Sequence, residues 1–171
     1  MSTQQNSPAS SLPRTAVVIV ASTRAHRGVY PDRSGPVLVR WLREQGFETP
    51  DPVVVPDSEV ADAVSRVLGD PAERPRILLT SGGTGLNSDD ATVEAVRAHL
   101  EKEIPGLMHA FWQKGLESTP AAVLSRGVAG VVGQSLVMTL PGSRGGVQDG
   151  VAVLEPVLPH ILRQLEDYHD H

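Results

Sequence analysis

The sequence predicts an α/β fold, a three-layer α/β/α sandwich around a mostly parallel central sheet. Short unbroken apolar runs, such as those at 16–21 and 77–79, are typical of strands buried on both faces of a parallel sheet. Segments with apolar residues at helical spacing separate these runs. Glycine-rich or polar loops follow several of the runs, at the carboxyl ends where open α/β sheets bind their ligands.

Length and composition set the frame for this fold. The 171 residues are expected to form a single domain over 14–168. Residues 1–13 are rich in Ser, Gln and Pro and offer almost nothing to bury, so we expect a disordered tail there. No apolar run reaches the length of a bilayer span and the N-terminus lacks a secretory signal, so the cytoplasm is the expected location.

Several classes of function are excluded or disfavoured. The absence of cysteine excludes disulfides, thiolate metal sites and cysteine nucleophiles. The six histidines show no metal-ligand spacing, and the His-Asp-His end at 169–171 is expected to be solvated, so we expect no structural metal. A net charge of −5 argues against general nucleic-acid binding. An anionic ligand remains compatible, because arginines recur near the loops at Arg24, Arg27, Arg33, Arg126 and Arg144.

The first expected strand, Ala16 to Ala21, leads into a long polar loop over 22–32, whose length indicates a functional segment. Ser34 is then expected to cap an amphipathic helix that stops at Gly46 in a left-handed conformation. A short strand over 53–55 follows, and Pro56-Asp57-Ser58 opens the next helix. By its position alone, Asp57 is an ordinary N-cap carboxylate.

The central stretch of the chain is a strand, a glycine loop and a helix start. After Ile77–Leu79, the sequence Ser81-Gly-Gly-Thr-Gly85 removes side chains where backbone N–H groups could approach an anion. The stretch is neither a Walker loop, since it has no lysine, nor a dinucleotide fingerprint, since Ser88 replaces the third glycine. A plain turn explains the glycines equally well. Thr92 is the expected N-cap of the following helix, which should run to Glu103.

The C-terminal third continues the alternation. A helix is expected to begin at Ile104-Pro-Gly, and its aromatic residues suit a core or subunit interface. Strands are expected at 121–124, ending in Ser125-Arg126, and at 131–133 and 135–140. The closing helix should run from Gln148 to Leu165 and be kinked or split by its two prolines, at 156 and 159.

Six ordered motifs together resemble the MogA/MoaB family of molybdenum cofactor biosynthesis proteins, to which the G domain of gephyrin also belongs. They are Gly28-Val-Tyr-Pro-Asp32 with Ser34-Gly35; Pro56-Asp57; Ser81-Gly-Gly-Thr-Gly85 with Asp90-x-Thr92-x-Glu94; Glu103-Ile-Pro-Gly106; Leu124-Ser-Arg126; and Leu140-Pro-Gly-Ser143. The resemblance covers roughly 15–165. The chain departs from the family at Thr23, where the family usually carries an acid.

The resemblance implies molybdopterin adenylyltransferase activity, in which molybdopterin and ATP give adenylyl-molybdopterin and pyrophosphate. The attacking phosphate is already an anion, so catalysis requires positioning and charge neutralisation rather than a general base. The resemblance implies that Asp57 and Asp90 are the catalytic acids, which would hold Mg²⁺ or orient the nucleophile. The family's acid stands two residues before a threonine, which selects Asp90 over Asp89.

The resemblance also implies the binding residues and partners. The nucleotide phosphates would lie against Ser81, Gly82, Gly83, Thr84, Gly85 and Thr92. Molybdopterin would contact Ser22, Asp32, Ser34, Ser125, Arg126, Pro141, Gly142 and Ser143. For Arg126, a surface or interface charge is the plainer interpretation. ATP with Mg²⁺ and molybdopterin are the implied substrates, with a homotrimer and a molybdenum-insertion protein as the implied assembly and partner, and no nucleic acid or membrane.

Two alternatives remain open from the sequence. One is a MoaB-like paralogue that binds molybdopterin or nucleotide without adenylation activity. The other is a trimeric scaffold module, as the G domain of gephyrin also is. The presence of Asp57 and Asp90 favours the enzyme, and calorimetric titration with ATP and Mg²⁺ would separate a binder from a scaffold.

Overall fold

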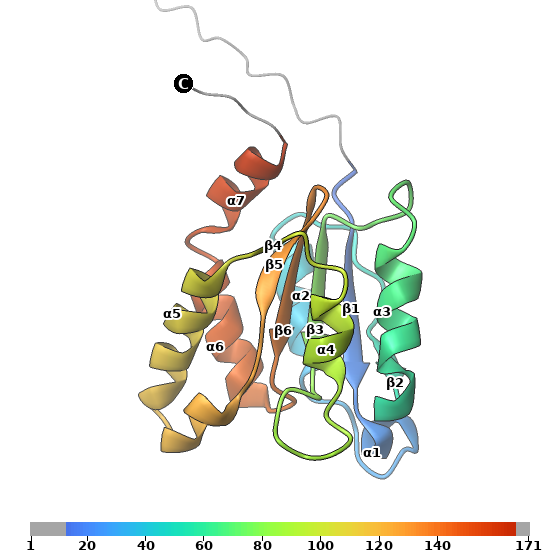
Figure 1. The fold of residues 1–171 in the computed structure, drawn as a ribbon, viewed down its shortest axis with the longest axis vertical. Helices are drawn as coiled ribbons and strands as arrows, with labels where there is room; N and C mark the ends of the chain where they lie inside the picture. Colours follow the sequence, from blue (N-terminus) through green and yellow to red (C-terminus); the bar gives the residue numbers. More distant parts are fainter. Residues whose placement is uncertain (1–12, 167–171) are drawn as a thin grey trace, which may run out of the picture.

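The computed structural model of the protein describes residues 13–166 (Figure 1). A six-stranded sheet has the order β2-β1-β3-β6-β5-β4. Its strands are β1 (Ala16–Ala21), β2 (Val53–Val55), β3 (Ile77–Ser81), β4 (Lys102–Glu103), β5 (Ala129–Val132) and β6 (Ser135–Leu140). The first four in the order are mutually parallel, β5 runs antiparallel to β6, and the edge strand β4 pairs antiparallel with β5. The predicted α/β fold with a mostly parallel sheet is therefore confirmed.

Helices cover both faces of this sheet. They are α1 (Thr23–His26), α2 (Gly35–Glu44), α3 (Val60–Leu68) with the preceding 3-10 turn η1 (Asp57–Glu59), α4 (Thr92–Arg97), α5 (Pro105–Leu116), the 3-10 helix η2 (Pro120–Leu124), α6 (Arg144–Leu154) and α7 (Leu158–Leu165). Figure 1 shows α4 in front of the sheet and α2 behind it.

Alternate residues of β1 divide the core between the two faces. Val18 and Val20 pack with α2, α5, α6 and α7, while Ile19 and Ala21 pack with α3 and α4. All four side chains are almost completely buried, as expected of a strand covered on both faces. This double burial is the physical reason for the unbroken apolar run in the sequence.

Two predicted elements differ from the structure near the edge of the sheet. Residues 121–124 form the 3-10 helix η2 and not a strand; Thr119 Oγ1 accepts the N–H of Ala121 at 3.3 Å, and Val123 and Leu124 are 58% and 53% exposed. The helix predicted over 92–103 ends at Arg97. The residues that follow pair with the sheet instead, because the N–H groups of residues 101 and 104 donate to β5 carbonyl oxygens at 2.9 and 2.7 Å.

Two predicted helix caps differ from the structure, one in its position and one in its hydrogen bond. Thr92 is the first helical residue of α4 and not its N-cap, and its N–H donates to Gly83 O at 3.1 Å. Ser34 occupies the predicted N-cap position of α2, but its side chain makes no capping hydrogen bond. Asp32 fills that role, since its Oδ1 accepts the N–H groups of Ser34 and Gly35, both at 3.0 Å.

Other boundaries follow the sequence closely. The loop over 22–32 contains the short helix α1, and Gly46 ends α2 with a φ of +89°, as predicted. The closing helix is split into α6 and α7, as its prolines predict, but α6 begins at Arg144 instead of Gln148. β5 spans 129–132, and Gly133 lies in the following turn with a φ of +57°.

The predicted disordered tail, except for residue 13, and the histidines of the predicted His-Asp-His end lie outside the described residues. Within 13–166, none of the helices combines the length and the apolar character that crossing a bilayer requires.

Candidate functional site

Four loops leave the same edge of the sheet. The register aligns Ala21 with Val55, Val20 with Ser81, and Ser81 with Leu140, so the four parallel strands end at nearly the same level. The segments 22–34, 56–58, 81–90 and 141–146 therefore begin side by side, where open α/β sheets place their ligands. This is the arrangement that the sequence predicts for the four loops.

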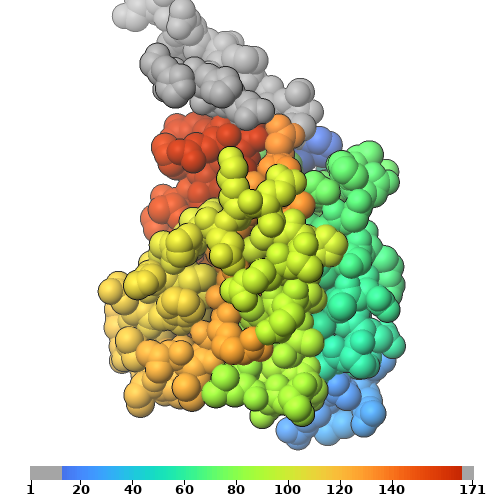
Figure 2. All heavy atoms as spheres, viewed as in Figure 1, coloured from blue at the N-terminus to red at the C-terminus, as the bar shows by residue number. Residues whose placement is uncertain are grey.

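A cavity of about 660 Å³ lies between the glycine loop, η2 and the beginning of α6. This volume is in the range of small-molecule sites. In the space-filling view of Figure 2, the loop after β3 and the segment before β5, lime and orange, meet at the lower part of the molecule. Among the predicted site residues, the cavity is lined by Gly82, Gly83, Thr84, Gly85, Asp90, Ser125, Pro141, Gly142 and Ser143.

A second hollow of about 230 Å³ adjoins the first. The predicted residues Ser22, Asp32 and Ser34 line it, together with Arg144. Gly142 lines both spaces, so the loop after β6 forms their common wall. The predicted molybdopterin residues are thus divided: Ser22, Asp32 and Ser34 line the hollow, whereas Ser125, Pro141 and Ser143 line the larger cavity with the predicted nucleotide residues.

The glycine loop has a conformation that other residues rarely adopt. Gly82 and Gly83 have φ values of +92° and +70°. A β-carbon on Gly82 would overlap the carbonyl oxygen of Ala21, and one on Gly83 would overlap Thr92 Oγ1. The glycines are therefore required by the fold itself, whatever they bind.

The backbone N–H groups of this loop differ in whether they are free to bind a ligand. Gly82 N donates to Leu140 O at 2.9 Å, which ties the loop to β6. Among residues 13–166, the N–H groups of Gly83, Thr84 and Gly85 have no backbone or side-chain acceptor. These three groups border the larger cavity, as an anion-binding loop requires.

Ser81 links three of the loops through the hydrogen bonds of its side chain. Its Oγ lies 2.8 Å from Ser34 Oγ and 3.0 Å from Pro141 O, and both serines are buried. Its side chain lines neither space. Thr92 is also fully buried, and its Oγ1 has no hydrogen-bond partner among the described residues.

Asp57 is held by Thr23, the residue at which the chain departs from the family pattern. Thr23 Oγ1 donates to Asp57 Oδ2 at 2.7 Å, Thr23 N donates to the same oxygen at 3.2 Å, and Asp57 N donates back to Thr23 Oγ1 at 3.1 Å. Asp57 lines neither the larger cavity nor the hollow beside it. The structure therefore does not place Asp57 and Asp90 in one cavity.

Asp90 lines the larger cavity. Its Oδ2 accepts the N–H of Asn87 at 3.0 Å, and Asp90 N donates to Asn87 O at 3.0 Å, so the loop closes on itself through these two residues. Asp90 is half-buried, whereas the neighbouring Asp89 is exposed and lines neither space. The geometry thus distinguishes the two acids as the sequence motif does.

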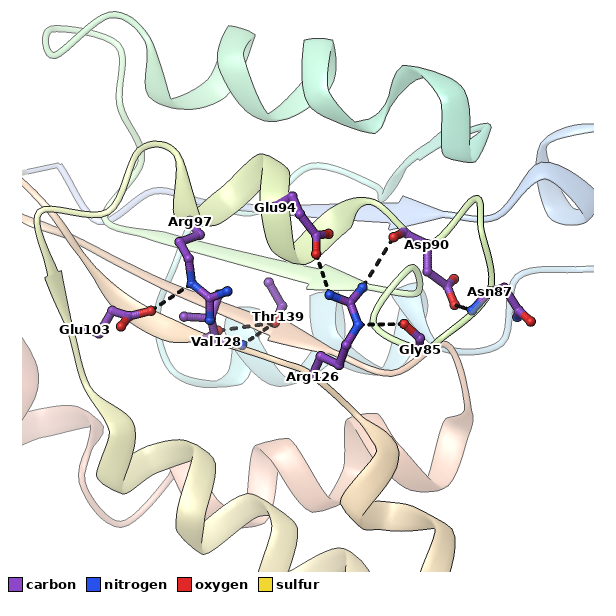
Figure 3. A network of polar contacts seen from close by, with 9 residues as sticks. All are labelled: Gly85, Asn87, Asp90, Glu94, Arg97, Glu103, Arg126, Val128 and Thr139. Atoms are coloured by element: carbon purple, nitrogen blue, oxygen red, sulfur yellow. Dashed lines mark hydrogen bonds and ion pairs between the residues drawn. The ribbon is translucent and has the colours of Figure 1, made fainter.

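Arg126 contacts the protein through all three guanidinium nitrogens (Figure 3). Nε donates to Gly85 O at 2.8 Å, Nη2 donates to Asp90 O at 3.3 Å, and Nη1 pairs with the carboxylate of Glu94. The hydrogen bond from Arg126 lowers the pKa of Glu94 below its usual value and raises that of Arg126. Arg126 does not line either space.

The residues of the site could hold a divalent cation only with help from a substrate. Within 13–166 there is no group of three or more His, Cys, Asp or Glu side chains arranged to hold a metal. Asp90 offers one carboxylate oxygen beyond the one that Asn87 occupies. That donor set fits Mg²⁺, which is commonly bound through one or two carboxylates together with substrate phosphates and water.

Two acidic residues of the site were not predicted. Asp149 lines the larger cavity from α6, and Glu94 holds Arg126. The available signal was Ser143, whose Oγ accepts the N–H of Gly146 at 3.1 Å and caps α6, the helix that carries Asp149 along the cavity. Glu94 belongs to the motif that follows the glycine loop, but its partner Arg126 could not be identified from spacing.

Comparison with known proteins identifies the domain. A family model described as a probable molybdopterin binding domain matches residues 17–160. The solved structure of the molybdopterin biosynthesis Mog protein from Mycobacterium ulcerans has 45% sequence identity and a TM-score of 0.82, covering 89% of this chain and 99% of that one.

Full-length and longer relatives agree with this match. Molybdenum cofactor biosynthesis protein B from Bacillus cereus is 34% identical over 155 residues, covering 89% of this chain and 90% of the relative. A molybdenum cofactor biosynthesis bifunctional protein from Chlorobaculum tepidum is 32% identical over 156 residues, and the chain spans 49% of its length. The chain therefore belongs to the MogA/MoaB family of molybdopterin-binding proteins of molybdenum cofactor biosynthesis.

Proposed function

We propose that this protein is a molybdopterin adenylyltransferase that transfers AMP from ATP to the terminal phosphate of molybdopterin. One observation carries the proposal: free backbone N–H groups of the glycine loop, the beginning of α6 and the Asp90 carboxylate converge on one cavity. Such a set binds phosphates and orients them for transfer, which is the main requirement of this chemistry.

The glycine loop supports the nucleotide side of the reaction. Gly83, Thr84 and Gly85 direct their N–H groups to the anionic phosphates of ATP, and the lack of side chains on two of them permits a close approach. Ser81 and Thr92 act beneath the loop, since both are buried and fix its shape. Their contribution is therefore to the geometry of the loop and not to direct contact with phosphate.

The loop after β6 supports the pterin side. Pro141, Gly142 and Ser143 stand between the two spaces, and α6 presents the positive end of its dipole there. Molybdopterin occupies the hollow at Ser22, Asp32 and Ser34, and its terminal phosphate reaches the shared wall at Gly142. Ser125 contacts it from the opposite side of the larger cavity.

The transfer itself needs no general base. An oxygen of the pterin phosphate, already ionised, attacks the α-phosphorus of ATP, a new phosphorus–oxygen bond forms, and the bond to the bridging oxygen breaks to release pyrophosphate. Asp90 orients the reacting groups, and Mg²⁺ bound with it would neutralise charge on the phosphates. Asp57 acts from the carboxyl end of β2, where Thr23 holds it in one orientation.

The direct test supplies the protein with molybdopterin, ATP and Mg²⁺ and looks for adenylyl-molybdopterin by mass spectrometry and for pyrophosphate. The matched control replaces ATP with an analogue that has a methylene group between the α- and β-phosphorus, which should bind without reacting. Adenylylated pterin with ATP alone supports the proposal. Nucleotide binding without product would indicate a MoaB-like binder, and trimerisation without any ligand binding would indicate a scaffold; either result would refute the enzyme.

A further inference from the structure

We propose that Arg126 is a positioning residue that holds the loop from Gly85 to Asp90 in its working shape, and that Glu94 completes this clamp. The inference deepens the proposed function, on which its catalytic consequence rests. It assigns Arg126 a different task from the direct contact with molybdopterin that the sequence motif suggests. The clamp itself is a property of the fold and can be tested without any substrate.

The contacts of Arg126 span the loop. Its backbone N–H donates to Thr84 O at 2.9 Å, and its Nε donates to Gly85 O at 2.8 Å, so the start of the loop is fixed. Its Nη2 donates to Asp90 O at 3.3 Å, so the end of the loop is fixed by the same side chain. The residues between are exposed, with Leu86 at 69%, and the two hydrogen bonds between Asn87 and Asp90 tie them only to the end of the loop itself.

The clamp has a rigid base. The next residues of the chain enter β5, and Val128 N donates to Thr139 Oγ1 at 2.8 Å while Thr139 N donates to Val128 O at 2.9 Å. Gly127 is packed so closely that a β-carbon there would meet Met108 at 2.7 Å. Arg126 therefore anchors the surface loop to a segment that is itself fixed against the sheet.

Charge also argues for positioning rather than substrate binding. The Arg126 guanidinium is paired with Glu94, so a phosphate would have to displace a carboxylate to reach it. If Arg126 bound the substrate directly, removing the charge of Glu94 would free it and tighten binding. If Arg126 is a clamp, removing Glu94 loosens the loop. The two roles thus predict opposite effects of one substitution.

The experiment compares the wild-type protein with Arg126→Lys, Glu94→Gln and the control Glu103→Gln. Lysine cannot reproduce the planar fork that serves three acceptors. Glu103 pairs with Arg97 at 3.1 Å, is as exposed as Glu94 and touches no residue of the loop, so it controls for loss of a surface ion pair (Figure 3). Glu94→Gln keeps the fold testable if Arg126→Lys fails to fold.

Hydrogen exchange of the Asn87 and Asp90 amides, which donate within the loop, is measured without ligand, and kcat and KM are measured for both substrates. We expect Arg126→Lys and Glu94→Gln to speed amide exchange in the loop and to lower kcat by about tenfold or more, with KM changed by less than about threefold. Glu103→Gln should match the wild type. Unchanged exchange in Glu94→Gln, or tighter substrate binding by it, would overturn the clamp. An inactive wild type would refute the proposed function, while the exchange data would still decide the clamp.

Discussion

Thr23 and Asp57 hold each other at the ends of neighbouring strands, with the threonine hydroxyl donating to Asp57 Oδ2 at 2.7 Å and accepting from Asp57 N at 3.1 Å. The hydroxyl is thus both donor and acceptor for one residue, 34 positions away in the sequence. This contact gives Asp57 a fixed orientation that the family pattern, with its usual acid at position 23, does not predict.

Removing that hydroxyl should therefore cost stability. Thr23→Val keeps the shape of the side chain but leaves Asp57 N and Oδ2 each without one partner, so the free energy of unfolding should fall by about 1–2 kcal/mol. Urea unfolding monitored by circular dichroism measures this change. Thr23→Ser, which keeps the hydroxyl, should lose less than about half as much, and equal losses in the two variants would show that the hydrogen bonds are not the cause.

Gly83→Ala should lower stability and nucleotide binding together. Its φ of +70° is unfavourable for alanine, and the new methyl group would overlap Thr92 Oγ1, so a loss of about 1–3 kcal/mol is expected. Adding Thr92→Ala should recover part of the loss, because it removes the overlapping hydroxyl, which has no partner among the described residues. Thermal melts of the single and double variants test this, and a Gly83→Ala protein as stable as wild type would contradict the packing argument.

A substitution at Gly145 can test ligand binding without disturbing the fold. It lines the larger cavity in the first turn of α6, and a β-carbon there would meet nothing within 4 Å. Gly145→Ala should leave the free energy of unfolding unchanged or raise it by up to about 1 kcal/mol, since alanine favours helix. Calorimetric titration with Mg²⁺ and ATP or molybdopterin should show weaker binding of one of them. Unaltered affinity for both would place the substrates away from the beginning of α6.

The ion pair between Glu94 and Arg126 should make the free energy of unfolding depend on pH. The hydrogen bond from Arg126 lowers the pKa of Glu94 below the ordinary 4.5. A carboxyl whose pKa is lower in the folded state stabilises the fold above its unfolded pKa and loses that contribution as the pH falls through the folded one. The difference in unfolding free energy between wild type and Glu94→Gln should therefore be constant near neutral pH and shrink below about pH 4.5.

Because Glu94 is 57% exposed at its side chain, solvent and salt screen this pair, and the difference should also shrink in high salt. Denaturant unfolding over a pH series, at low and high salt, provides the measurement. A difference that grew as the pH fell would mean that the sign of the Glu94 pKa shift is wrong.

The buried strands could be predicted because their burial on both faces is encoded locally. Ile77, Leu78 and Leu79 are apolar in succession, and all three are fully buried between two layers of helices. The loops that follow such strands share one edge by topology, so the position of the site was also accessible from the sequence. The family motifs then selected residues that line it, such as Asp90 and Ser143.

What could not be predicted depends on partners far away in the sequence. Lys102 and Glu103 are exposed and carry no strand pattern, yet they pair with β5 because the neighbouring N–H groups find its carbonyls. Ser81 and Arg126 both belong to recognisable motifs, but their side chains contact the protein instead of lining the cavity. Residue type and spacing identify such positions without giving the direction of the side chain.

The most direct test of the account compares adenylyl transfer by Asp90→Asn and Asp89→Asn. Asp90 lines the cavity and Asp89 does not, and asparagine can keep the hydrogen bond from Asn87 N, so both variants should fold like the wild type. Single-turnover formation of adenylyl-molybdopterin should fall by about a hundredfold or more in Asp90→Asn and much less in Asp89→Asn. Full activity in Asp90→Asn, or equal losses in the two variants, would contradict the assignment of Asp90 as the acid that orients the transfer.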